Sequence, residues 1–482
     1  MQRYQLFIDG QWRDPSTGRW FATANPYTGE AWAEIPRGDA ADVELAVAAA
    51  HRAFSTGAWP ALSASQRGRL VRRFGEVLEK HAAELATIEA RDNGKLYAET
   101  FNQARYLCEW FQFYGGLADK IEGSVPAMDK PDVLNYTRHE PLGVCACITP
   151  WNSPLLLLAW KAAPALAAGN TLVIKPSEFT SASTLEFARL SIEAGLPPGV
   201  VNVVTGFGAE VGEPLVRHPK VRKVAFTGGE AGGRSVNVAA AADFKRVTLE
   251  LGGKSANIVF ADADLDQAVS GAISGIFAAS GQTCIAGSRL LLQDSIHDEF
   301  IERLLAIARH AKLGDPMRPD TQVGPITTEP QYRRILDYIA IAKAEGARCV
   351  LGGEAAKLPG VDGLFVQPTI FADVTPHMRI AQEEVFGPVL AVLRFKDLDE
   401  AVAIANDVNY GLAAGVWTEN LRRAVRMADR LQAGTVWVNT YRSTSYTTPF
   451  GGYKASGLGR ENGVEAIKEY LQVKSVWLYT GG

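Results

Sequence analysis

The feature that most constrains the fold of this chain is a regular alternation of short apolar runs with helix-like stretches between about residues 140 and 260. The runs are rich in β-branched residues and lack polar alternation, which is typical of strands buried on both faces. We expect strands at 144–148, 171–174, 200–204, 224–226 and 247–249, and helices such as 181–194 and 210–217 between them. This βαβ order predicts a parallel, doubly wound α/β sheet.

A second alternating block runs from about residue 255 to 440, with helix-like stretches at 264–279 and 330–345. It predicts a second α/β domain. At 482 residues the chain exceeds the size at which one core keeps growing, so two or three domains are expected. The tail, 465–479, indicates a helix followed by an apolar strand at 473–478. Such a strand is expected to pair elsewhere in the chain or with another subunit.

Charge and composition narrow the function classes. The 49 Lys+Arg residues nearly balance 53 Asp+Glu residues, and no basic block stands out, so nucleic acid is not an expected partner. The five cysteines are scattered, with no CxxC pair, which argues for a reducing compartment and against a metal site. The N-terminus lacks the apolar stretch of a signal peptide, and the longest apolar segment, 155–168, is interrupted by Lys161 and Pro164. We therefore expect a cytoplasmic protein with no membrane partner.

One cysteine, Cys284, lies among small neutral residues, 34 positions after Glu250. A thiol can attack a carbonyl carbon and later leave it, so a lone cysteine with a separate carboxylate predicts covalent catalysis through a thioester. A buried structural cysteine is the commoner alternative. Glycines at 281 and 287 favour the catalytic interpretation because they let backbone approach a ligand.

Two glycine clusters follow predicted strands. Residues 206–212 read GxGxxxG, one residue longer than the dinucleotide fingerprint, and residues 228–235 read GxxxxG followed by Arg-Ser rather than the Lys-Ser/Thr of a P-loop. Neither motif is complete, and plain helix-start glycines explain each cluster about equally well. What both retain is a strand that passes through glycines into a helix, whose N-terminal N–H groups suit a pyrophosphate.

Polar side chains also follow the predicted strands. Asn152 lies in a loop at the carboxyl end of one strand, where open sheets bind ligands, and its amide could donate to a developing oxyanion. An asparagine in a loop is otherwise commonly a turn residue. Lys175 and Glu178 end the next strand, where they could meet ribose hydroxyls or form a plain surface loop. Glu384 adds a further carboxylate beside aromatic loop residues.

Seven long motifs occur in one order along nearly the whole chain: TPWNSPL, KPSE, FTGG, LELGGKS, GQTCIAGSR, EEVFGPV and PFGGYKASGLGRENG. In them the chain resembles the aldehyde dehydrogenase superfamily, specifically its NAD(P)-dependent, non-acylating members. Any one motif could be accidental, but all seven in order are highly specific. The resemblance implies oxidation of an aldehyde to the carboxylic acid with reduction of NAD(P)⁺.

The resemblance also implies roles for individual residues. Cys284 is the expected nucleophile, the Asn152 amide and the Cys284 N–H form the expected oxyanion hole, and Glu250 is the expected general base for hydrolysis. Lys161 and Glu461 match the family's proton-relay positions. The residues expected to contact the cofactor are Thr149, Pro150, Trp151, Lys175, Ser177, Glu178, Gly208, Phe226, Thr227, Gly228, Gly229, Leu251, Glu384 and Phe386.

Cofactor choice and domain organisation follow from the same resemblance. Glu178 is expected to bind the adenosine ribose and to repel a 2′-phosphate, so NAD is expected, with NADP possible because Lys175 is near. Gly229 replaces a family serine, which leaves backbone N–H donors there. The expected domains are an NAD(P)-binding domain of residues 1–121 and 141–250, a catalytic domain of 251–440, and an oligomerisation element of 122–140 and 465–482. A homodimer or homotetramer is expected.

The substrate is the least constrained feature. By resemblance, the side chains facing the aldehyde are expected to be Tyr106, Trp110, Trp160, Thr283, Ile285, Arg442 and Phe450. Aromatic side chains favour an apolar or aromatic aldehyde, although core packing explains Tyr106 and Trp110 about equally well. Arg442 leaves a carboxylated semialdehyde open. Glu250 argues against a CoA-acylating enzyme, no GxSxG motif supports a serine hydrolase, and the presence of Cys284 argues against a non-catalytic structural member.

Overall fold

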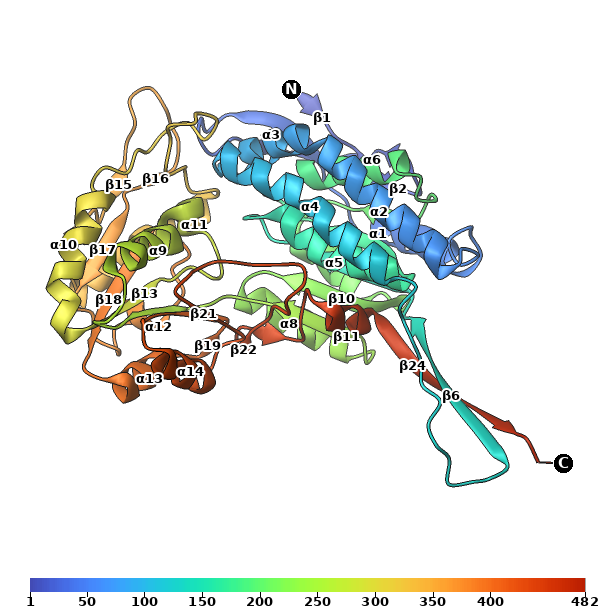
Figure 1. Ribbon diagram of the computed structural model, residues 1–482. Helices are drawn as coiled ribbons and strands as arrows, with labels where there is room; N and C mark the ends of the chain where they lie inside the picture. The colour runs from blue at the N-terminus through green and yellow to red at the C-terminus, as the bar shows by residue number, and fades with distance from the viewer. Residues whose placement is uncertain (482) are drawn as a thin grey trace.

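A computed structural model describes residues 1–481 and shows two α/β bodies with a slender arm (Figure 1). The first sheet has eight strands in the order β23-β11-β10-β7-β8-β9-β2-β3, and its five central strands are parallel. Its strands are β2 (Leu6–Ile8), β3 (Gln11–Arg13), β7 (Val144–Ile148), β8 (Thr171–Lys175), β9 (Val201–Val203), β10 (Val221–Thr227), β11 (Arg246–Glu250) and β23 (Gly457–Leu458). The expected doubly wound sheet is confirmed.

The order of the strands creates a topological switch point. The chain runs from β7 through β8 to β9 in one direction, then returns to place β10 on the other side of β7. Connections from β7 and β10 therefore leave in opposite directions, and a crevice opens between their carboxyl ends. Ligands bind at this position in open α/β sheets.

Successive residues of the buried strands face two separate cores. Cys145 and Cys147 of β7 belong to one apolar cluster, whereas Val144 and Ala146 belong to another on the opposite face. This alternation follows from the two-residue period of a strand. The two cysteines therefore share one face of β7 and serve as packing residues.

Helices cover both faces of the first sheet, and a third layer lies outside them (Figure 1). Helices α1, α7 and α8 pack on one face, α5 and α6 on the other, and α2 and α4 lie beyond α5. Their bounds are α1 (Ala40–Ser55), α2 (Ala64–Lys80), α3 (Ala82–Asn93), α4 (Tyr97–Leu117), α5 (Pro154–Ala168), α6 (Ala182–Glu193), α7 (Glu213–Arg217) and α8 (Glu230–Ala241). The expected helix at 210–217 instead begins with a π-helical turn at Gly208–Gly212.

The ends of these helices follow local sequence signals. Asp39 and Asp42 form a capping box at the start of α1, and Ser63 and Gln66 form another at α2. Helix α5 begins with Pro154 in its first turn, where the missing N–H costs nothing, and ends at Gly169 in the left-handed region. Because α5 directly follows the Asn152 loop, this start places that loop at the end of β7.

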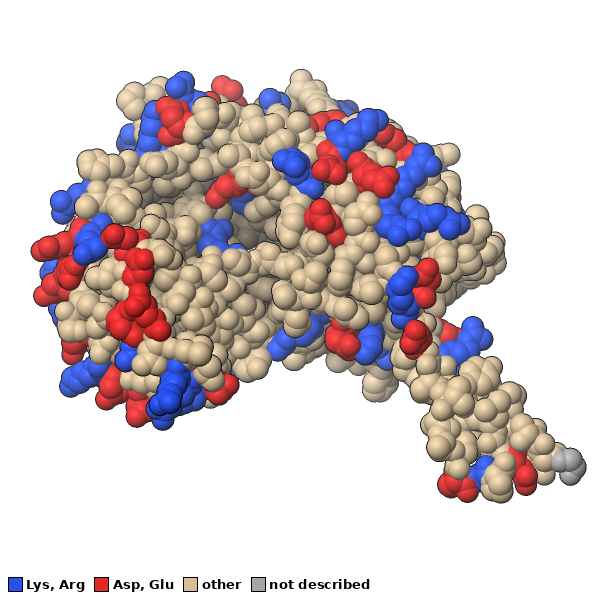
Figure 2. All heavy atoms as spheres, in the orientation of Figure 1, with Lys and Arg blue, Asp and Glu red and all other residues tan. Residues whose placement is uncertain are grey.

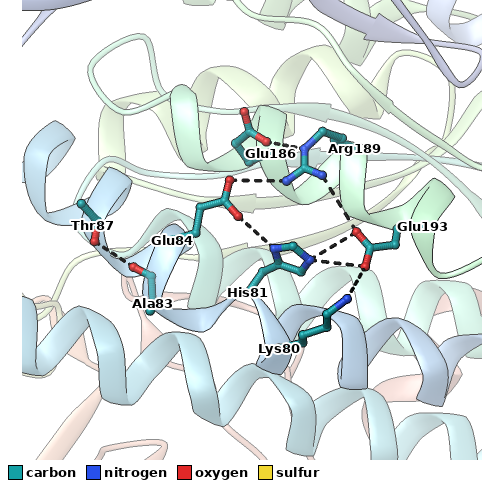
Figure 3. Close-up of polar contacts among 8 residues, drawn as sticks. All are labelled: Lys80, His81, Ala83, Glu84, Thr87, Glu186, Arg189 and Glu193. Carbon is teal, nitrogen blue, oxygen red and sulfur yellow. Dashed lines mark hydrogen bonds and ion pairs between the residues drawn. The ribbon is translucent and has the colours of Figure 1, made fainter.

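A network of charged side chains joins the layers at one edge (Figure 3). His81, between α2 and α3, contacts Glu84 through Nδ1 at 2.9 Å and Glu193 of α6 through Nε2 at 3.2 Å. Lys80 also contacts Glu193, and Arg189 contacts Glu84 at 3.5 Å. These side chains are between 21 % and 71 % exposed, so each pair contributes little alone. Together the pairs connect α2, α3 and α6.

The second sheet has seven strands in the order β14-β17-β18-β13-β12-β20-β21, all parallel except β14. They are β12 (Ala256–Val259), β13 (Arg289–Gln293), β14 (Arg348–Leu351), β17 (Thr369–Ala372), β18 (Val389–Phe395), β20 (Ala413–Trp417) and β21 (Thr435–Val438). The helices of this body are α9 (Leu265–Phe277), α10 (His297–Ala308), α11 (Glu329–Ala344), α12 (Arg379–Gln382), α13 (Leu398–Asn406) and α14 (Leu421–Arg430). Helices α9 and α10 pack on one face, and α11 to α14 pack on the other.

Small sheets complete the chain. A three-stranded sheet near the N-terminus has the order β1-β5-β4, and two short pairs are β15-β16 and β19-β22. Their bounds are β1 (Gln2–Arg3), β4 (Trp20–Ala24), β5 (Ala31–Pro36), β15 (Ala355–Ala356), β16 (Phe365–Val366), β19 (Tyr410–Gly411) and β22 (Tyr453–Lys454).

The arm is an antiparallel pair of β6 (Val133–Pro141) and β24 (Leu471–Tyr479), which projects from the first body (Figure 1). The terminal strand begins two residues earlier than expected, and residues 122–132 contain no strand, so the partner of β6 comes from the far end of the chain. Strand β23, from outside the expected boundaries of the first domain, joins the first sheet. Uncharged atoms cover most of the arm in Figure 2, whereas charges of both signs are scattered over the bodies.

No helix within residues 1–481 has both the length and the apolar character needed to cross a bilayer.

Candidate active site

The switch point of the first sheet opens into a cleft of about 530 Å³. Residues Thr149–Asn152 follow β7, and Gly228 and Gly229 follow β10 and lead into α8. Every residue expected to contact the cofactor lines this cleft, as do Asn152 and Cys284. The cleft therefore joins the two bodies, with Lys175 from the first sheet and Cys284 from the second body on its wall.

Open space lies beside the N-terminal backbone N–H groups of α8 in the cleft wall. A Cβ atom added at Gly229 would have no neighbour within 4 Å, and because this N-cap residue is a glycine, no side chain of its own caps α8. The first N–H groups of this twelve-residue helix therefore face open space, which suits an anion. Gly229 replaces the family serine without filling the site.

Two charged groups at the end of β8 lie against each other. Lys175 is buried, and its Nζ donates to the Pro176 carbonyl at 2.9 Å and contacts Glu178 Oε2 at 3.5 Å. Burial lowers the pKa of Lys175, while the Glu178 carboxylate opposes that change. The carboxylate of Glu178 is 28 % exposed, so it can accept hydrogen bonds from a ligand in the cleft.

Away from Lys175 and Glu178, the Glu384 side chain in the cleft wall is held by a hydrogen bond from a backbone N–H group. Its Oε1 accepts a hydrogen bond from the Gly253 N–H at 2.8 Å. Burial raises the pKa of Glu384 to about 7. Phe386 has φ +58°, and its ring meets Trp151 edge-to-face at 5.3 Å between centroids. These two rings therefore border the cleft from opposite bodies.

Cys284 lies in the loop after α9, partly exposed to the cleft. Burial raises the pKa of the Cys284 thiol to about 12, and the nearby Glu384 and Glu250 carboxylates act in the same direction. The resting group is therefore a neutral thiol, and a proton acceptor is needed to form the nucleophilic thiolate.

The Asn152 side chain reaches the same loop from the first body. Its Nδ2 donates to the Gln282 carbonyl at 2.9 Å, two residues before Cys284. The side chain is 8 % exposed, so the amide acts in a largely dehydrated environment. The geometry brings the expected oxyanion-hole donor and the expected nucleophile together.

Glu250, the last residue of β11, is 3 % exposed, and neither of its carboxylate oxygens has a hydrogen-bond partner among the described residues. Burial raises the pKa of Glu250 well above its usual value, and the neighbouring Glu461 carboxylate raises it further. A carboxylate with a raised pKa is a stronger base once it is ionised. The next two residues, Leu251 and Gly252, line the cleft together with Cys284, so Glu250 lies directly behind the wall of the same site.

A buried ion pair lies behind Glu250. Lys161 of α5 is fully buried, and its Nζ contacts Glu461 Oε1 at 2.5 Å and Thr227 Oγ1 at 2.6 Å. The second oxygen of Glu461 has no hydrogen-bond partner in the described part of the chain. Glu461 raises the pKa of Glu250 and Lys161 lowers it, so both members of the pair are neighbours of Glu250. Lys161 and Glu461 are the residues expected at the proton-relay positions.

Aromatic side chains form one continuous cluster. Trp110 stacks on Trp160 at 6.0 Å, Trp160 meets Phe450 at 4.9 Å, and Tyr106 meets Trp110 at 4.9 Å. Trp110 is fully buried and donates to Asn462 Oδ1 at 2.7 Å, whereas Tyr106 is 38 % exposed. Thus the cluster extends from the protein surface inward.

The other residues expected to face the aldehyde flank Cys284. Thr283 is partly exposed and Ile285 is buried. Arg442 is partly buried, has φ +64°, and donates from Nη1 to the Ser274 carbonyl at 2.8 Å. This hydrogen bond ties the loop after β21 to α9.

Several residues of the site carry no signal in the sequence. Gln331 and Arg334 of α11 line the cleft, and Gln331 Nε2 donates to the Val385 and Phe386 carbonyls. Their spacing of three residues predicts a shared helix face but not the cleft that this face borders. Lys95 was also missed, although its Nζ donates to Ser153 Oγ at 2.5 Å beside Asn152. No group of three or more His, Cys, Asp or Glu side chains within residues 1–481 is arranged to hold a metal ion.

Comparison with known proteins extends these observations. The aldehyde dehydrogenase family model matches residues 12–476. The chain is 48 % identical to an aldehyde dehydrogenase of Aspergillus niger, over 98 % of this chain and 94 % of that protein. It is 47 % identical to retinaldehyde dehydrogenase 3 of Rattus norvegicus, over 98 % and 92 % of the two chains. The NAD⁺ complex of an aldehyde dehydrogenase from Bacillus cereus superposes with a TM-score of 0.97 at 43 % identity, covering 100 % of this chain and 97 % of that one.

Proposed function

Because this chain belongs to the aldehyde dehydrogenase family and is thus an enzyme that oxidises aldehydes to acids, we propose that it acts on an apolar or aromatic aldehyde through a Cys284 thioester. The observation that carries the proposal is the convergence of Cys284 and Asn152 on one cleft, with the buried Glu250 directly before the cleft residues Leu251 and Gly252. The three groups come from different parts of the chain. The Cys284 thiol would be the nucleophile, the Asn152 amide would stabilise the oxyanion, and the Glu250 carboxylate would be the base for hydrolysis.

The cleft fits NAD. The N–H groups at the start of α8 suit its pyrophosphate, and Lys175 and Glu178 would hold the adenosine ribose. Glu384 would hold the nicotinamide ribose beside Phe386. NAD⁺ supplies a hydride acceptor when it is bound. The B. cereus relative binds NAD⁺, which supports this choice. The carboxylate of Glu178 would repel a 2′-phosphate, so NAD⁺ should be preferred over NADP⁺.

The chain's own residues account for the first half of the reaction. Cys284 gives up its proton to water in the cleft, and its sulfur attacks the aldehyde carbon, which forms a C–S bond and moves the carbonyl π electron pair onto oxygen. The Asn152 amide and the Cys284 N–H donate hydrogen bonds to this oxyanion. Loss of hydride from the tetrahedral adduct restores the C=O bond and leaves a thioester on Cys284.

The second half hydrolyses the thioester. Glu250 takes a proton from water as the water oxygen attacks the thioester carbon, and collapse of that adduct breaks the C–S bond. The products are the carboxylic acid and the regenerated Cys284. Lys161 and Glu461 lie where they can pass the proton from Glu250 onward.

The aromatic cluster supports an apolar or aromatic substrate. Trp110, Trp160 and Phe450 present rings rather than charges. A relative is named for retinaldehyde, which is an apolar aldehyde. The test is a steady-state panel of aliphatic, aromatic and carboxylated aldehydes with both cofactors, ranked by kcat/KM. A higher kcat/KM for carboxylated than for aromatic aldehydes would refute the substrate assignment, and formation of NADH by Cys284→Ala would refute the mechanism.

One observation favours a carboxylated semialdehyde as a second candidate. Lys95 is 9 % exposed, donates to Ser153 beside Asn152, and lies where the charges of Cys284 and Arg442 act on it. Neither Lys95 nor Arg442 lines the cofactor cleft. Alanine at Arg442 should change kcat/KM for apolar and carboxylated aldehydes by similar factors if the first proposal holds. A selective loss for carboxylated aldehydes would favour the second.

The domain roles form part of the same proposal. Residues 1–121 and 141–250 would bind NAD, and residues 251–440 would carry the nucleophile. The oligomerisation element, 122–140 with 465–482, would pair with another copy through the arm to give a dimer or tetramer. Its apolar side chains support this: Val473, Trp477 and Tyr479 are 61 %, 57 % and 75 % exposed.

A further inference from the structure

The backbone just before Cys284 is held in an uncommon conformation. Ala279 and Ser280 have φ +51° and +52°, and Gly281 follows with φ +70°. Left-handed conformation is disfavoured for residues that carry a Cβ, so two such residues in a row persist only when their surroundings hold them. Gly281 cannot be replaced without movement, because a Cβ there would lie 2.1 Å from the Gly387 carbonyl oxygen.

Most of the hydrogen bonds that hold this turn come from the second body. Ser280 Oγ donates to the Gly324 carbonyl at 2.8 Å, and Gln282 Oε1 accepts from the Thr327 N–H at 3.0 Å. The Ala279 N–H is different. It donates at 3.0 Å to the Glu99 carboxylate, which comes from the first turn of α4, 180 residues away in the sequence.

Glu99 lies in a segment that also contacts the Asn152 loop. Lys95, four residues earlier, donates to Ser153 Oγ at 2.5 Å, and the charges of Lys95 and Glu99 attract each other. One end of the segment 95–99 therefore contacts the loop that carries Asn152, and the other contacts the turn before Cys284. The second oxygen of Glu99 is buried with no hydrogen-bond partner among the described residues, so it is the Oε1 contact that holds the carboxylate.

We propose that Glu99 is a positioning residue for the oxyanion hole: by accepting the Ala279 N–H, it fixes the left-handed turn that presents Cys284 to the Asn152 amide. The turn sets the direction of the Gln282 carbonyl, to which Asn152 Nδ2 donates in the resting site. When the substrate oxyanion forms, the same amide must donate to it instead. A displacement of the turn therefore moves Cys284 and its bound substrate relative to Asn152 and changes the length of the hydrogen bond from the Asn152 amide to the oxyanion. The inference rests on the proposed roles of Cys284 and Asn152.

The hydrogen bond from the Ala279 N–H to Glu99, rather than the charge of Glu99 alone, positions the turn. Glu99→Gln keeps a carbonyl oxygen that can accept the Ala279 N–H, whereas Glu99→Leu removes the acceptor at similar size. Rates of NADH formation in a single turnover should fall about 10- to 100-fold for the leucine variant and about 3-fold for the glutamine variant. The KM for NAD⁺ should stay unchanged, because Glu99 does not line the cofactor cleft.

A double-mutant cycle separates positioning from general damage. With Asn152→Ala in place, the amide that Glu99 positions is gone, so adding Glu99→Leu should slow the single turnover by only about 2-fold. Glu302→Leu, on the exposed face of α10, is the control for introducing leucine at a surface glutamate and should match the parent enzyme. The Tm of each variant shows that it is folded.

The outcomes are distinct. Equal losses from Glu99→Leu in the parent and in the Asn152→Ala background would overturn the proposal, as would a glutamine variant as slow as the leucine variant. If the leucine variant does not fold, Glu99→Ala, which also removes the acceptor, takes its place, and an unchanged single-turnover rate in that variant overturns the proposal. Failure of the proposed function would appear separately, because the parent enzyme would then form no NADH from any aldehyde.

Discussion

Replacement of Glu250 by glutamine should separate hydride loss from hydrolysis. The carboxylate is 3 % exposed and has no hydrogen-bond partner among the described residues, so an amide of the same shape fits without breaking a contact. It cannot accept the proton of the attacking water. The neighbouring Glu461 is paired with Lys161, so it does not replace the lost base. General-base loss typically costs about 10²–10⁴-fold in rate, and we expect kcat to fall within that range.

The assay is rapid mixing of enzyme, NAD⁺ and aldehyde with detection of NADH. The variant should release up to one NADH per active site and then nearly stop, with an acyl group on Cys284 detectable by mass spectrometry. Glu302→Gln, at an exposed position, is the matched control and should turn over like the parent enzyme. If Glu250→Gln sustains the parent rate in steady state, the assignment of Glu250 as the deacylation base is wrong.

The raised pKa of Glu250 gives the same experiment a pH dependence. Ionised Glu250 is the active base, so hydrolysis in the parent enzyme should accelerate as pH rises through that raised pKa, and the glutamine variant should lose this dependence. The contribution of Glu250 to folding stability changes in the opposite direction: it falls as pH rises. A raised folded-state pKa contributes stability that is present below the unfolded-state value and is lost as pH rises through the folded-state value. The Tm of the variant should therefore equal or exceed that of the parent at alkaline pH, which excludes unfolding as the cause of lost turnover.

Three further perturbations test other parts of the molecule. Glu178→Gln should narrow the preference for NAD⁺, measured as the ratio of kcat/KM values for NAD⁺ and NADP⁺; an unchanged ratio would refute the repulsion argument. Gly281→Ala should lower stability by about 2 kcal/mol or more in denaturant unfolding, because of its positive φ and the 2.1 Å approach of its Cβ to a carbonyl, whereas Gly116→Ala, with open space around its Cβ, should not. Trp477→Ser on the exposed arm should weaken self-association in sedimentation experiments, and an unchanged oligomer would rule out this face of the arm as the interface.

Much of the fold was predictable because its signals are local. Runs such as 144–148 and 171–174 are short, apolar and β-branched, and the structure has strands at both. The boundaries of α9 and α11 differ from the expected ones by one or two residues. The π-helical turn before α7 and the absence of any strand at 122–132 were not predicted, because both depend on what packs or pairs with these segments.

Part of the site was predictable for a different reason. Cys284, Glu250 and Asn152 lie in motifs whose residue types are tied to one chemistry, so the motifs indicated these residues before any geometry was known. The expected contacts of the cofactor likewise follow glycine-rich or charged strand ends, and all of them line the cleft. Gln331 and Arg334 lie on a helix with ordinary composition, and no local pattern distinguishes them from solvated residues.

The sequence by itself determined the order of strands and helices, the family and the identity of the reactive groups, because periodicity and motif chemistry are properties of neighbouring residues. Only the tertiary structure decided that the Glu99 carboxylate meets the Ala279 N–H across 180 residues, that residues 122–132 form no strand beside β6, and that burial raises the pKa of Glu250. Hydrogen bonds between distant segments and the loss of water around a charge depend on how the whole chain packs. Neither feature can be inferred from the pattern of neighbouring residues.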